Sequence, residues 1–468
     1  MGRRKKPFIT NVEITDIGAE GKAIAKVNGK ILFVPMCIPG DIADIQVNRM
    51  RKNYMEGYVV EYKKHSENRE EPFCEHFGIC GGCKWQHLPY VDQLKYKEKQ
   101  VNDHFERIGK ITGYERLSIY PSKDIKFYRN KLEFTFSDSR WMTKEELDSG
   151  KEITERNALG FHIPQRFEKI LDLKNCYLQK EPSEKIRKEI RKYAINNDYS
   201  FFNVLKEEGL LRHLIIRTSE AGETMVIVSF FYDDKIKRIK LLEYIQCTFP
   251  EITSVYYVIN SKKNDILYDL DIELYSGKDH IIDKLDGLKF KIGPKSFYQT
   301  NSIQAENLYK IVKDFCEPDK KDIIYDLYTG TGTIAIFLAR FCKLCIGVEL
   351  IPEAIDDANQ NAQINNIENT RFFSGDVKEV LQNKVLDAFQ KPDIVIVDPP
   401  RNGMHSDVVE CLISLKPSKI VYVSCNPATQ ARDIFLLKDH FELKKIQPVD
   451  MFPHTHHVEN VALLTLKI

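Results

Sequence analysis

The sequence predicts a multidomain α/β protein with three parts, and three observations support this class. Five short segments rich in β-branched residues fill the first 62 residues, a pattern typical of a small β-barrel. From residue 291 onward, strand-like and helix-like segments alternate, as in a doubly wound parallel sheet. The stretch between them mixes both kinds of segment, and a length of 468 residues leaves room for about three domains.

The N-terminal part, residues 1–64, is predicted to be an OB-like β-barrel. Asn28-Gly29 favours a type I′ turn between two strands, and Pro39-Gly40 marks another turn. OB-like folds often bind nucleic acid, and residues 1–70 carry 13 Lys and Arg against 9 Asp and Glu. RNA binding and a purely structural β module both fit this pattern. The expected strands are FITNVEI, KAIAKV, KILFV, DIADIQV and EGYVVEY.

The central part, residues 65–290, opens with the segment CEHFGICGGCKWQH. It holds Cys74, Cys80 and Cys83 at the spacing C-x5-C-x2-C. The chain has eleven cysteines, an odd number, and no export signal, so we expect mostly reduced thiols. A cluster of thiols then favours a metal, and three of them need a fourth ligand. Zinc and an iron–sulfur cluster both accept four cysteines, so the spacing leaves the metal open.

The remainder of the central part is expected to be α+β. Apolar residues at helical spacing predict a helix over about residues 90–110, which we expect to pack on the C-terminal domain. The expected apolar stripe is Val91, Leu94, Val101, Phe105 and Ile108. Arg129 and Lys131, beside two aromatic residues, fit an RNA contact or, more commonly, a solvated strand face. The expected strands are FYRNKLEFTF, LRHLIIRTS, ETMVIVSFF and ITSVYYVIN.

The C-terminal part, residues 291–468, contains a glycine pattern that suits a cofactor. Gly330 and Gly332 follow the strand-like DIIYDLY, and Glu349 stands 19 residues after Gly330, at the end of the next strand. A carboxylate there can accept hydrogen bonds from ribose hydroxyls, and Asp376 after the third strand could receive an adenine amine. NAD and S-adenosylmethionine both fit this geometry, and so does a purely structural turn.

Two further motifs lie at predicted strand ends. In Asp398-Pro399-Pro400-Arg401 the prolines stiffen a loop over this face of the sheet. Methyltransferases that act on amino groups place an aromatic residue where this chain has Arg401, so amine methylation loses support. Cys425, in Ser424-Cys425-Asn426-Pro427, follows the next strand and could be a nucleophile or a buried packing residue.

The motifs together carry a resemblance that extends from about Phe8 to the end of the chain. GPKSFYQTN, DLYTGTGTI, DPPRNG, VYVSCNP and HHVENV, in this order, resemble the RNA uridine-5-methyltransferases. The segment CEHFGICGGCKWQH and the N-terminal β module, which is a TRAM domain in that family, narrow the resemblance to one subgroup of it. The chain is similar to the iron–sulfur subgroup that makes 5-methyluridine in bacterial 23S ribosomal RNA.

The resemblance implies a set of site residues. Cys425 matches the nucleophile, and Glu459 matches the base that removes the C5 proton. Thr333 stands where the family often has Asn, and Tyr328 replaces a frequent Phe. A 4Fe–4S cluster is expected on Cys74, Cys80, Cys83 and Cys176. The expected contacts to S-adenosylmethionine are Gln299, Tyr328, Thr333, Glu349, Asp376 and Asp398.

The implied activity is transfer of a methyl group from S-adenosylmethionine to C5 of a specific uridine, through a covalent bond between Cys425 and C6. The resemblance favours 23S ribosomal RNA, with a transfer-RNA loop as the alternative target. Cytosine-5 RNA methylation is a further alternative, but its usual Cys after Pro is missing from DPPRNG. A non-catalytic RNA-binding iron–sulfur protein would not need Cys425 together with Glu459.

The remaining expectations concern location and side features. The start, MGRRKKPF, has no apolar stretch after it, so we expect no signal peptide. No apolar run approaches the roughly 20 residues of a membrane span. We expect a cytoplasmic protein that acts as a monomer. Cys342-x2-Cys345 fits a redox pair, but buried packing is the more common outcome. His454, His456 and His457 fit a polar loop beside the active site better than a zinc site.

Overall fold

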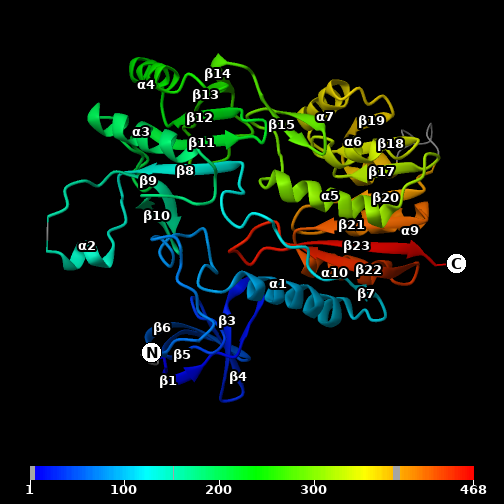
Figure 1. Ribbon diagram of the computed structural model, residues 1–468, viewed down its shortest axis with the longest axis horizontal. Helices are drawn as coiled ribbons and strands as arrows, with labels where there is room; N and C mark the ends of the chain where they lie inside the picture. Colours follow the sequence, from blue (N-terminus) through cyan, green and yellow to red (C-terminus); the bar gives the residue numbers. More distant parts are fainter. Residues whose placement is uncertain (1–5, 151, 383–390, 468) are drawn as a thin grey trace.

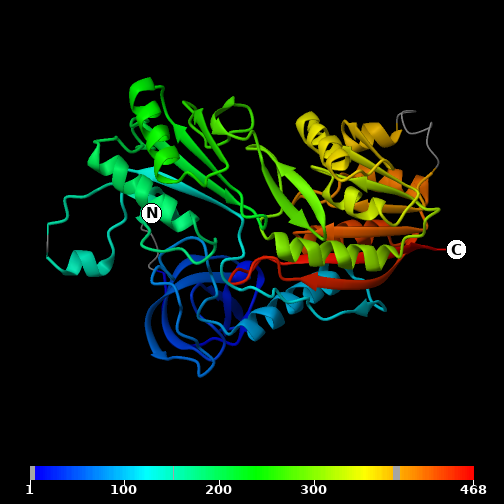
Figure 2. The same cartoon turned by 45° about the horizontal axis from the view of Figure 1, so that its top comes forward.

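The structure is a computed structural model that describes residues 6–150, 152–382 and 391–467. Its strands form a six-stranded, a seven-stranded and an eight-stranded sheet and one separate hairpin. The six-stranded N-terminal sheet lies below the other two in Figure 1, and a long helix runs between it and the C-terminal sheet. The turned view in Figure 2 keeps the same three bodies apart.

The N-terminal sheet has the strand order β1-β5-β6-β4-β3-β2. All five expected strands are confirmed, and the additional β2 is too short, at two residues, to leave a pattern. Asn28 and Gly29 both have positive φ, 51° and 75°, as a type I′ turn requires. The strands are β1 (Phe8–Glu13), β2 (Asp16–Ile17), β3 (Ala23–Val27), β4 (Lys30–Val34), β5 (Ile42–Met50) and β6 (Tyr54–Lys64), and a 3-10 turn, η1 (Ala19–Gly21), follows β2.

Helix α1 (Tyr90–His104) follows the cysteine-rich loop and continues into a π-helical turn, η2 (Phe105–Gly109). The apolar stripe expected for this helix is partly wrong. Val91 is 71% exposed and Ile108 42% exposed. The buried face instead repeats every four residues through Gln93, Lys97, Val101 and Phe105. Two of these residues are polar, so a hydrophobic pattern could not find the face.

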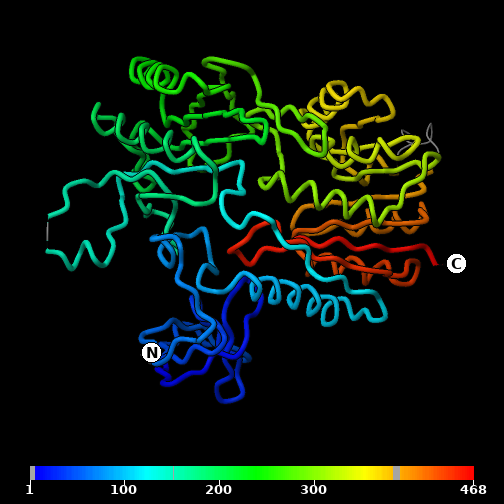
Figure 3. The backbone as a smooth tube through the Cα atoms, in the orientation of Figure 1, coloured from blue at the N-terminus to red at the C-terminus, as the bar shows by residue number. Residues whose placement is uncertain are grey.

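The central sheet has the order β10-β9-β8-β11-β12-β13-β14 and is antiparallel except for the β12–β13 pair. The described part of the β8–β9 connection, which carries α2, extends away from it (Figure 3). Helices α3 and α4 pack on each other, and their buried residues join the core of this sheet. The elements are β8 (Lys131–Ser137), α2 (Lys144–Asp148), β9 (Ala158–Ile163), β10 (Arg166–Asp172), α3 (Ser183–Asn196), β11 (Leu211–Thr218), β12 (Thr224–Phe230), α4 (Lys235–Thr248), β13 (Ser254–Ile259) and β14 (Ile272–Gly277).

The hairpin β15 (Ile281–Leu285) and β16 (Leu288–Ile292) links the central sheet to the C-terminal one. It leads into α5 (Ser302–Cys316), which contacts strands of both the hairpin and the C-terminal sheet. The loop between β16 and α5 contains the motif GPKSFYQTN, so this motif lies where the two bodies meet.

The C-terminal sheet has the order β19-β18-β17-β20-β21-β23-β22-β7. The expected doubly wound sheet is confirmed: β17 to β21 are parallel, and β23 is antiparallel beside β21. Core clusters cover both faces. The strands are β17 (Ile323–Leu327), β18 (Leu344–Glu349), β19 (Thr370–Ser374), β20 (Ile394–Val397), β21 (Lys419–Ser424), β22 (Phe441–Val449) and β23 (Glu459–Leu466). The helices are α6 (Thr333–Ala339), α7 (Pro352–Ile364), α8 (Val377–Gln382), α9 (Ser406–Leu415) and α10 (Pro427–Leu437).

One strand of this sheet comes from far away in the chain. β7 (Glu115–Arg116), which follows α1, pairs in parallel with β22, and Tyr120 bridges to Val449. Helix α1 and its π turn contact α10 in the same region. Within the described ranges, none of the helices combines the length and apolarity that crossing a membrane would require.

Candidate active site at the carboxyl ends of the strands

The loops at the carboxyl ends of the parallel strands carry most of the residues expected to act. This is the edge where an open α/β sheet binds its ligands, because each loop there leaves the sheet toward the same side. Tyr328 follows β17, Glu349 ends β18, Asp376 follows β19, Asp398 follows β20 and Cys425 follows β21. Glu459 begins the antiparallel β23, so it reaches the same edge from the opposite direction.

The glycine loop after β17 brings backbone amides to this edge. Gly330 and Gly332 have φ of 56° and 78°, a region where a side chain is strained. A Cβ on Gly332 would come within 2.8 Å of Ala358, whereas a Cβ on Gly330 would meet no atom within 4 Å. Gly330 therefore leaves open space beside its backbone, as a bound cofactor would need. Its N–H donates to Glu349 Oε2 at 3.1 Å.

Glu349 lies beside this open space, and Tyr328 precedes the glycine loop. The other Glu349 oxygen accepts a hydrogen bond from the Ile351 N–H at 3.1 Å. Burial, followed by the negative charges of Asp376, Asp433 and Glu349, raises the pKa of Tyr328 to about 12. The phenol of Tyr328 therefore stays neutral, and it lies near the carboxylates of Asp376, Asp433 and Glu349. Asp376 itself is exposed, with one oxygen accepting from the Lys378 N–H at 2.9 Å.

Thr333 and Gln299 occupy less open positions. The Thr333 hydroxyl is 3.0 Å from the Tyr309 hydroxyl, which ties it to the core side of α6. The carbonyl of Gln299 accepts from Asn130 Nδ2 at 2.9 Å, and the Asn130 N–H donates to the carbonyl of Thr300 at 2.8 Å. Asn130 precedes β8, so the central sheet holds the loop that carries Gln299.

Cys425 and Glu459 lie at neighbouring strand ends. Ser424 and Asn460 are register partners in the β21–β23 pair, so the residue after one strand and the first residue of the other lie side by side. Burial and the negative charges of Glu459 and Asp398 raise the pKa of the Cys425 thiol to about 11. The nearby Arg401 guanidinium opposes this shift and favours the thiolate.

Two carboxyl groups share this buried space with the thiol. Burial, and then the charge of Asp398, raises the pKa of Glu459 to about 8, against the pull of Arg401. Burial and the charge of Asp326 raise the pKa of Asp398 to about 7. Groups with pKa values near neutrality can give and take protons under ordinary conditions, which is what acid–base catalysis needs.

Arg401 is the residue that sequence reasoning undervalued. In the sequence it served only to argue against amine methylation, yet its guanidinium lowers the pKa of both Cys425 and Glu459. Its backbone is fixed, because its carbonyl accepts from Asn426 Nδ2 at 2.9 Å and from the Thr429 hydroxyl at 3.2 Å. The feature of the sequence that could have pointed to Arg401 was its position directly after Pro399 and Pro400.

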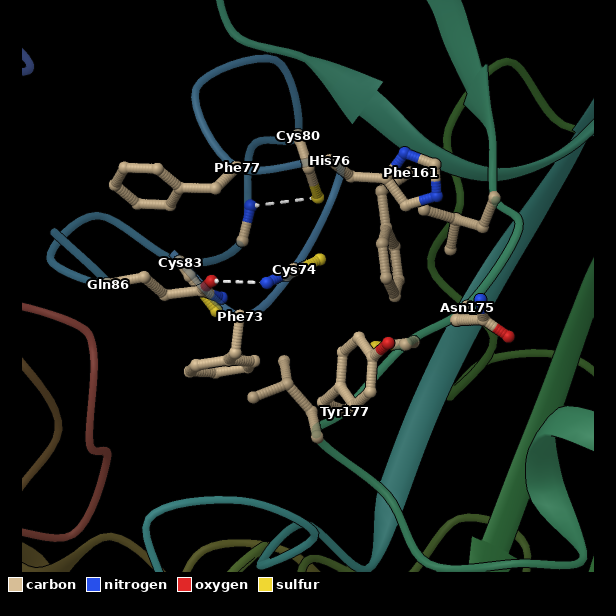
Figure 4. A pocket seen from close by; sticks show the side chains of 14 residues that line it. Phe73, Cys74, His76, Phe77, Cys80, Cys83, Gln86, Phe161, Asn175 and Tyr177 are labelled. Carbon is tan, nitrogen blue, oxygen red and sulfur yellow. Dashed lines mark hydrogen bonds between the residues drawn. The ribbon is translucent and has the colours of Figure 1, made fainter. Parts of the chain in front are cut away.

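The four predicted cluster cysteines line one small cavity of about 30 Å³ (Figure 4). Cys74, Cys80 and Cys83 come from the loop before α1, and Cys176 comes from the loop between β10 and α3. The Cys74 N–H donates to Gln86 Oε1 at 3.1 Å, and the Gly82 N–H lies 3.4 Å from Cys80 Sγ. The other lining residues are Phe73, His76, Phe77, Gly82, Gln86, Phe161, Leu173, Asn175, Tyr177 and Leu178.

The chemistry of this cavity is that of buried thiols. Burial raises the pKa of Cys83 to about 11 and that of Cys176 to about 12, and it also raises those of Cys74 and Cys80. Across residues 6–150, 152–382 and 391–467, no group of three or more His, Cys, Asp or Glu side chains is arranged to hold a metal ion. The structure thus gathers the four cysteines in one cavity, and within the described residues they are not arranged around a single metal ion.

The other candidate groups have simpler roles. Cys342 and Cys345 are buried, at 3% and 0% exposed, and neither forms a disulfide. His454, His456 and His457 lie in the loop before Glu459, with the His456 and His457 ring centroids 4.2 Å apart. Burial lowers the pKa of each to about 4, so all three are neutral near pH 7.

Comparisons with known proteins agree with this architecture. Residues 223–467 match the model of the tRNA (Uracil-5-)-methyltransferase family, and residues 9–60 match the TRAM domain. A protein of Bacteroides thetaiotaomicron named as an uncharacterized RNA methyltransferase is 52% identical over 96% of this chain and 100% of its own length. One of the same name from Porphyromonas gingivalis is 49% identical over 97% and 99%.

A solved structure is similar over almost the whole chain. It is the Pyrococcus abyssi tRNA (uracil-54, C5)-methyltransferase in complex with S-adenosyl-L-homocysteine, 31% identical, with a TM-score of 0.75 over 98% of this chain and 100% of that one. The chain therefore belongs to the tRNA (uracil-5-)-methyltransferase family and carries an N-terminal TRAM domain.

Proposed function

We propose that this protein transfers a methyl group from S-adenosylmethionine to C5 of a uridine in RNA, with Cys425 as nucleophile and Glu459 as base. One observation carries the proposal: a cysteine and a buried carboxyl group with a raised pKa meet at adjacent strand ends, beside a guanidinium. Membership of the family and the substrate named for the Pyrococcus abyssi structure support the same chemistry.

S-adenosylmethionine fits the residues beside the glycine loop. The open space at Gly330 lets its backbone approach a ligand, and Glu349 borders that space with two acceptor oxygens. Gln299, Tyr328, Thr333, Asp376 and Asp398 would complete the site. The bound cofactor would supply an electrophilic methyl group, and the Pyrococcus abyssi enzyme was solved with S-adenosyl-L-homocysteine, the demethylated product of that cofactor.

Cys425 acts first in the proposed reaction. Uracil C5 is a weak nucleophile, and addition of a thiolate to C6 makes C5 an enolate carbon that can accept the methyl group. The thiol has a pKa of about 11, so it is protonated near neutral pH and must give its proton to water before it adds to C6. Arg401 lowers the pKa of the Cys425 thiol and can stabilise the negative charge of the enolate.

Glu459 completes the reaction. After methylation, C5 carries both the methyl group and its original proton, and the thiol cannot leave until that proton is removed. The carboxylate of Glu459 takes the proton, and the electron pair of the broken C5–H bond expels Cys425 from C6. A pKa of about 8 makes Glu459 a stronger base than an exposed carboxylate once it is ionised.

The RNA must present an unstacked uridine to this site. A base inside a helix cannot place C6 against a cysteine at a strand end, so the target nucleotide has to flip out of its stack. The TRAM domain then offers a second contact with RNA, away from the reacting base. We propose that basic residues of this N-terminal part, which has 13 Lys and Arg against 9 Asp and Glu over residues 1–70, bind the phosphate backbone.

Two RNA classes remain candidates for the target. The motif resemblance favours 23S ribosomal RNA, whereas the Pyrococcus abyssi structure, similar over the whole chain, is named for uracil-54 of transfer RNA. Incubating the protein with tritiated S-adenosylmethionine and purified ribosomal or transfer RNA will decide between them. Mapping the labelled base to a 5-methylcytidine instead would contradict the proposed reaction.

We also propose that Cys74, Cys80, Cys83 and Cys176 hold a 4Fe–4S cluster. The support is that four thiols from two distant segments line one cavity with a mostly apolar wall. The test is the colour and metal content of anaerobically purified protein, which should be brown with about four iron and four sulfide per chain. Zinc without sulfide would contradict the cluster.

Three further expectations complete the proposal. The domain boundaries are residues 1–64, 65–290 and 291–468, and the protein acts as a cytoplasmic monomer on RNA. Limited proteolysis tests the boundaries, because cleavage concentrates in exposed connections between domains. Sedimentation of the purified chain tests the monomer.

The covalent step has a direct test. RNA with 5-fluorouridine at the target should be methylated once and remain bonded to Cys425, because fluorine cannot leave as a positive ion. Cys425→Ala should lose both methylation and the adduct while it still binds S-adenosylmethionine. Peptide mapping that finds the RNA on another cysteine, or turnover by Cys425→Ala, would overturn the mechanism.

A further inference from the structure

Loop 450–458 joins β22 to β23 and ends at the proposed base, Glu459, and several distant segments hold it. Figures 1 and 2 show this red segment beside the start of α1. The carbonyl groups of four successive residues in this loop, 451–454, each accept a hydrogen bond from a donor elsewhere in the chain. The bonds are Met451 from Asn301 Nδ2 (3.0 Å), Phe452 from Lys97 Nζ (3.0 Å), Pro453 from the Tyr128 hydroxyl (3.0 Å), and His454 from the N–H groups of Lys84 (2.7 Å) and Trp85 (3.1 Å).

The centre of this arrangement is a buried ion pair. Lys97 Nζ lies 2.5 Å from Asp450 Oδ1, and both side chains are fully buried. The other Asp450 oxygen accepts from the Tyr90 hydroxyl at 2.8 Å, and Asp450 Oδ1 also accepts from the Phe452 N–H at 3.2 Å. Lys97 thus binds both the first residue of the loop and the carbonyl of its third residue.

A second polar residue on the same helix face holds the middle of the loop. Gln93 lies one turn before Lys97, and its Oε1 accepts from the His454 N–H at 2.9 Å. Its Nε2 lies 3.1 Å from His454 Nδ1 and donates to the carbonyls of Trp85 and Leu88 at 3.0 and 2.8 Å. The two polar residues on the buried face of α1 therefore both serve this loop.

The position of the ion pair in the sheet connects it to Glu459. Val449 and Glu459 are register partners in the β22–β23 pair, and Asp450 follows Val449 directly. Fixing Asp450 therefore fixes the backbone next to Glu459. A buried ion pair is seldom better for stability than apolar residues of the same size, so stability alone does not account for two buried charges here. A role in holding the backbone beside Glu459 in place does account for them.

We infer that Lys97, through Asp450, is a positioning residue that sets the place of Glu459 for removal of the C5 proton. The inference rests on the proposed reaction. Lys97 touches neither the uracil nor the cofactor in this role. Its loss should slow the step that uses Glu459 and leave the addition of Cys425 to C6 unaffected, because Cys425 is held by β21 and α10 instead.

The test uses the double variant Lys97→Met/Asp450→Asn in the full chain. Removing both charges leaves no unpaired buried ion, and both new side chains are close in size to the originals. Turnover on natural RNA should fall about 100-fold, the cost expected for a small misplacement of a reacting group. Methylated RNA should accumulate covalently on Cys425, while 5-fluorouridine RNA forms its adduct at the wild-type rate.

The matched control is Lys95→Met, the same substitution on the same helix at an exposed position. It should show wild-type turnover and no accumulated complex. Wild-type turnover by the folded double variant would overturn the inference, and so would equal loss of turnover and of adduct formation. If the double variant does not fold, Tyr90→Phe removes the hydroxyl that donates to Asp450 and accepts from the Ser122 N–H, and it should show the same accumulation to a smaller degree. Absence of that accumulation would overturn the inference.

Glu459→Gln separates this inference from the proposed reaction. If Glu459→Gln turns over normally, the base has been assigned wrongly and the reaction must be revised. If Glu459→Gln accumulates the covalent complex but the Lys97 double variant does not, the reaction stands and only the positioning role fails.

Discussion

Two regions of this molecule carry the half-buried cysteines of the proposed chemistry, and they differ in what surrounds the sulfur. In the cavity formed by the loops before α1 and before α3, the wall is largely apolar and four thiols lie together. At the end of β21, a single thiol lies among Glu459, Asp398 and Arg401. Burial raises the pKa of Cys83 and of Cys425 to about 11 alike. The neighbours, and not the degree of burial, therefore distinguish the proposed ligand set from the proposed nucleophile.

The largest effects should come from removing one cysteine in each region. Cys425→Ala should abolish methyl transfer and change the free energy of unfolding by less than about 1 kcal/mol, because the side chain is half-buried and small. If the cavity holds the proposed cluster, Cys83→Ala should lose iron and destabilise the central domain, because a structural metal site contributes directly to folding. Iron analysis, denaturant unfolding and methylation assays check both variants. Equal effects of the two variants on stability would break the comparison.

Glu459→Gln should have the next largest effect, and on one step only. The variant keeps the shape of the side chain but cannot take a proton, so natural RNA should accumulate as a covalent, methylated complex on Cys425. Denaturing gels with labelled RNA measure it. Fast turnover would move the base elsewhere, with His457 as the candidate from the adjoining loop.

The same residue should make stability depend on pH. Its pKa is about 8 in the folded chain against 4.5 for an ordinary glutamate, so between these values the folded state binds more protons than the unfolded state. The free energy of unfolding should therefore fall as pH rises from about 4.5 to 8, by at most about 1.4 kcal/mol per pH unit from this group. Glu459→Gln should flatten that slope in urea unfolding. An unchanged slope would mean that Glu459 is already ionised at neutral pH.

Arg401→Met should have a moderate effect that distinguishes the two cysteine environments. Without the guanidinium, the pKa of Cys425 should rise, and a rise of one unit lowers the thiolate fraction about tenfold at a given pH. The rate of Cys425 alkylation by iodoacetamide against pH measures the change. Alkylation of the exposed Cys247, on α4 of the central domain, serves as the control in the same sample. An unchanged Cys425 profile would remove Arg401 from the mechanism.

The smallest effect should come from the TRAM domain. Arg51→Ser/Lys52→Ser removes two exposed charges between β5 and β6. If both contact phosphates, the slope of log affinity against log salt should become shallower by about two, with cofactor binding unchanged. Filter binding across a salt series measures this. An unchanged slope would place the phosphate contacts on another face of the domain.

Local patterns in the sequence determined much of the fold. The five N-terminal strands follow from β-branched runs separated by turn residues such as Asn28-Gly29, whose φ angles match the predicted turn. The parallel sheet follows from the alternation of strand and helix, and the order of its motifs led to the family. These features can be predicted from the sequence because each depends on residues close together in the chain. The family match and the register of β21 with β23 agree with this interpretation.

Tertiary structure alone decided how the site is held. Gln93 and Lys97 look like surface residues of an amphipathic helix, yet both are buried. They are buried because they bond to His454 and Asp450, which lie more than 350 residues away in the chain. The pairing of β7 with β22 and the effect of Arg401 on Cys425 are hidden for the same reason. A buried charged side chain needs a partner that compensates the cost of leaving water, and where that partner is distant in the chain no local pattern can announce it.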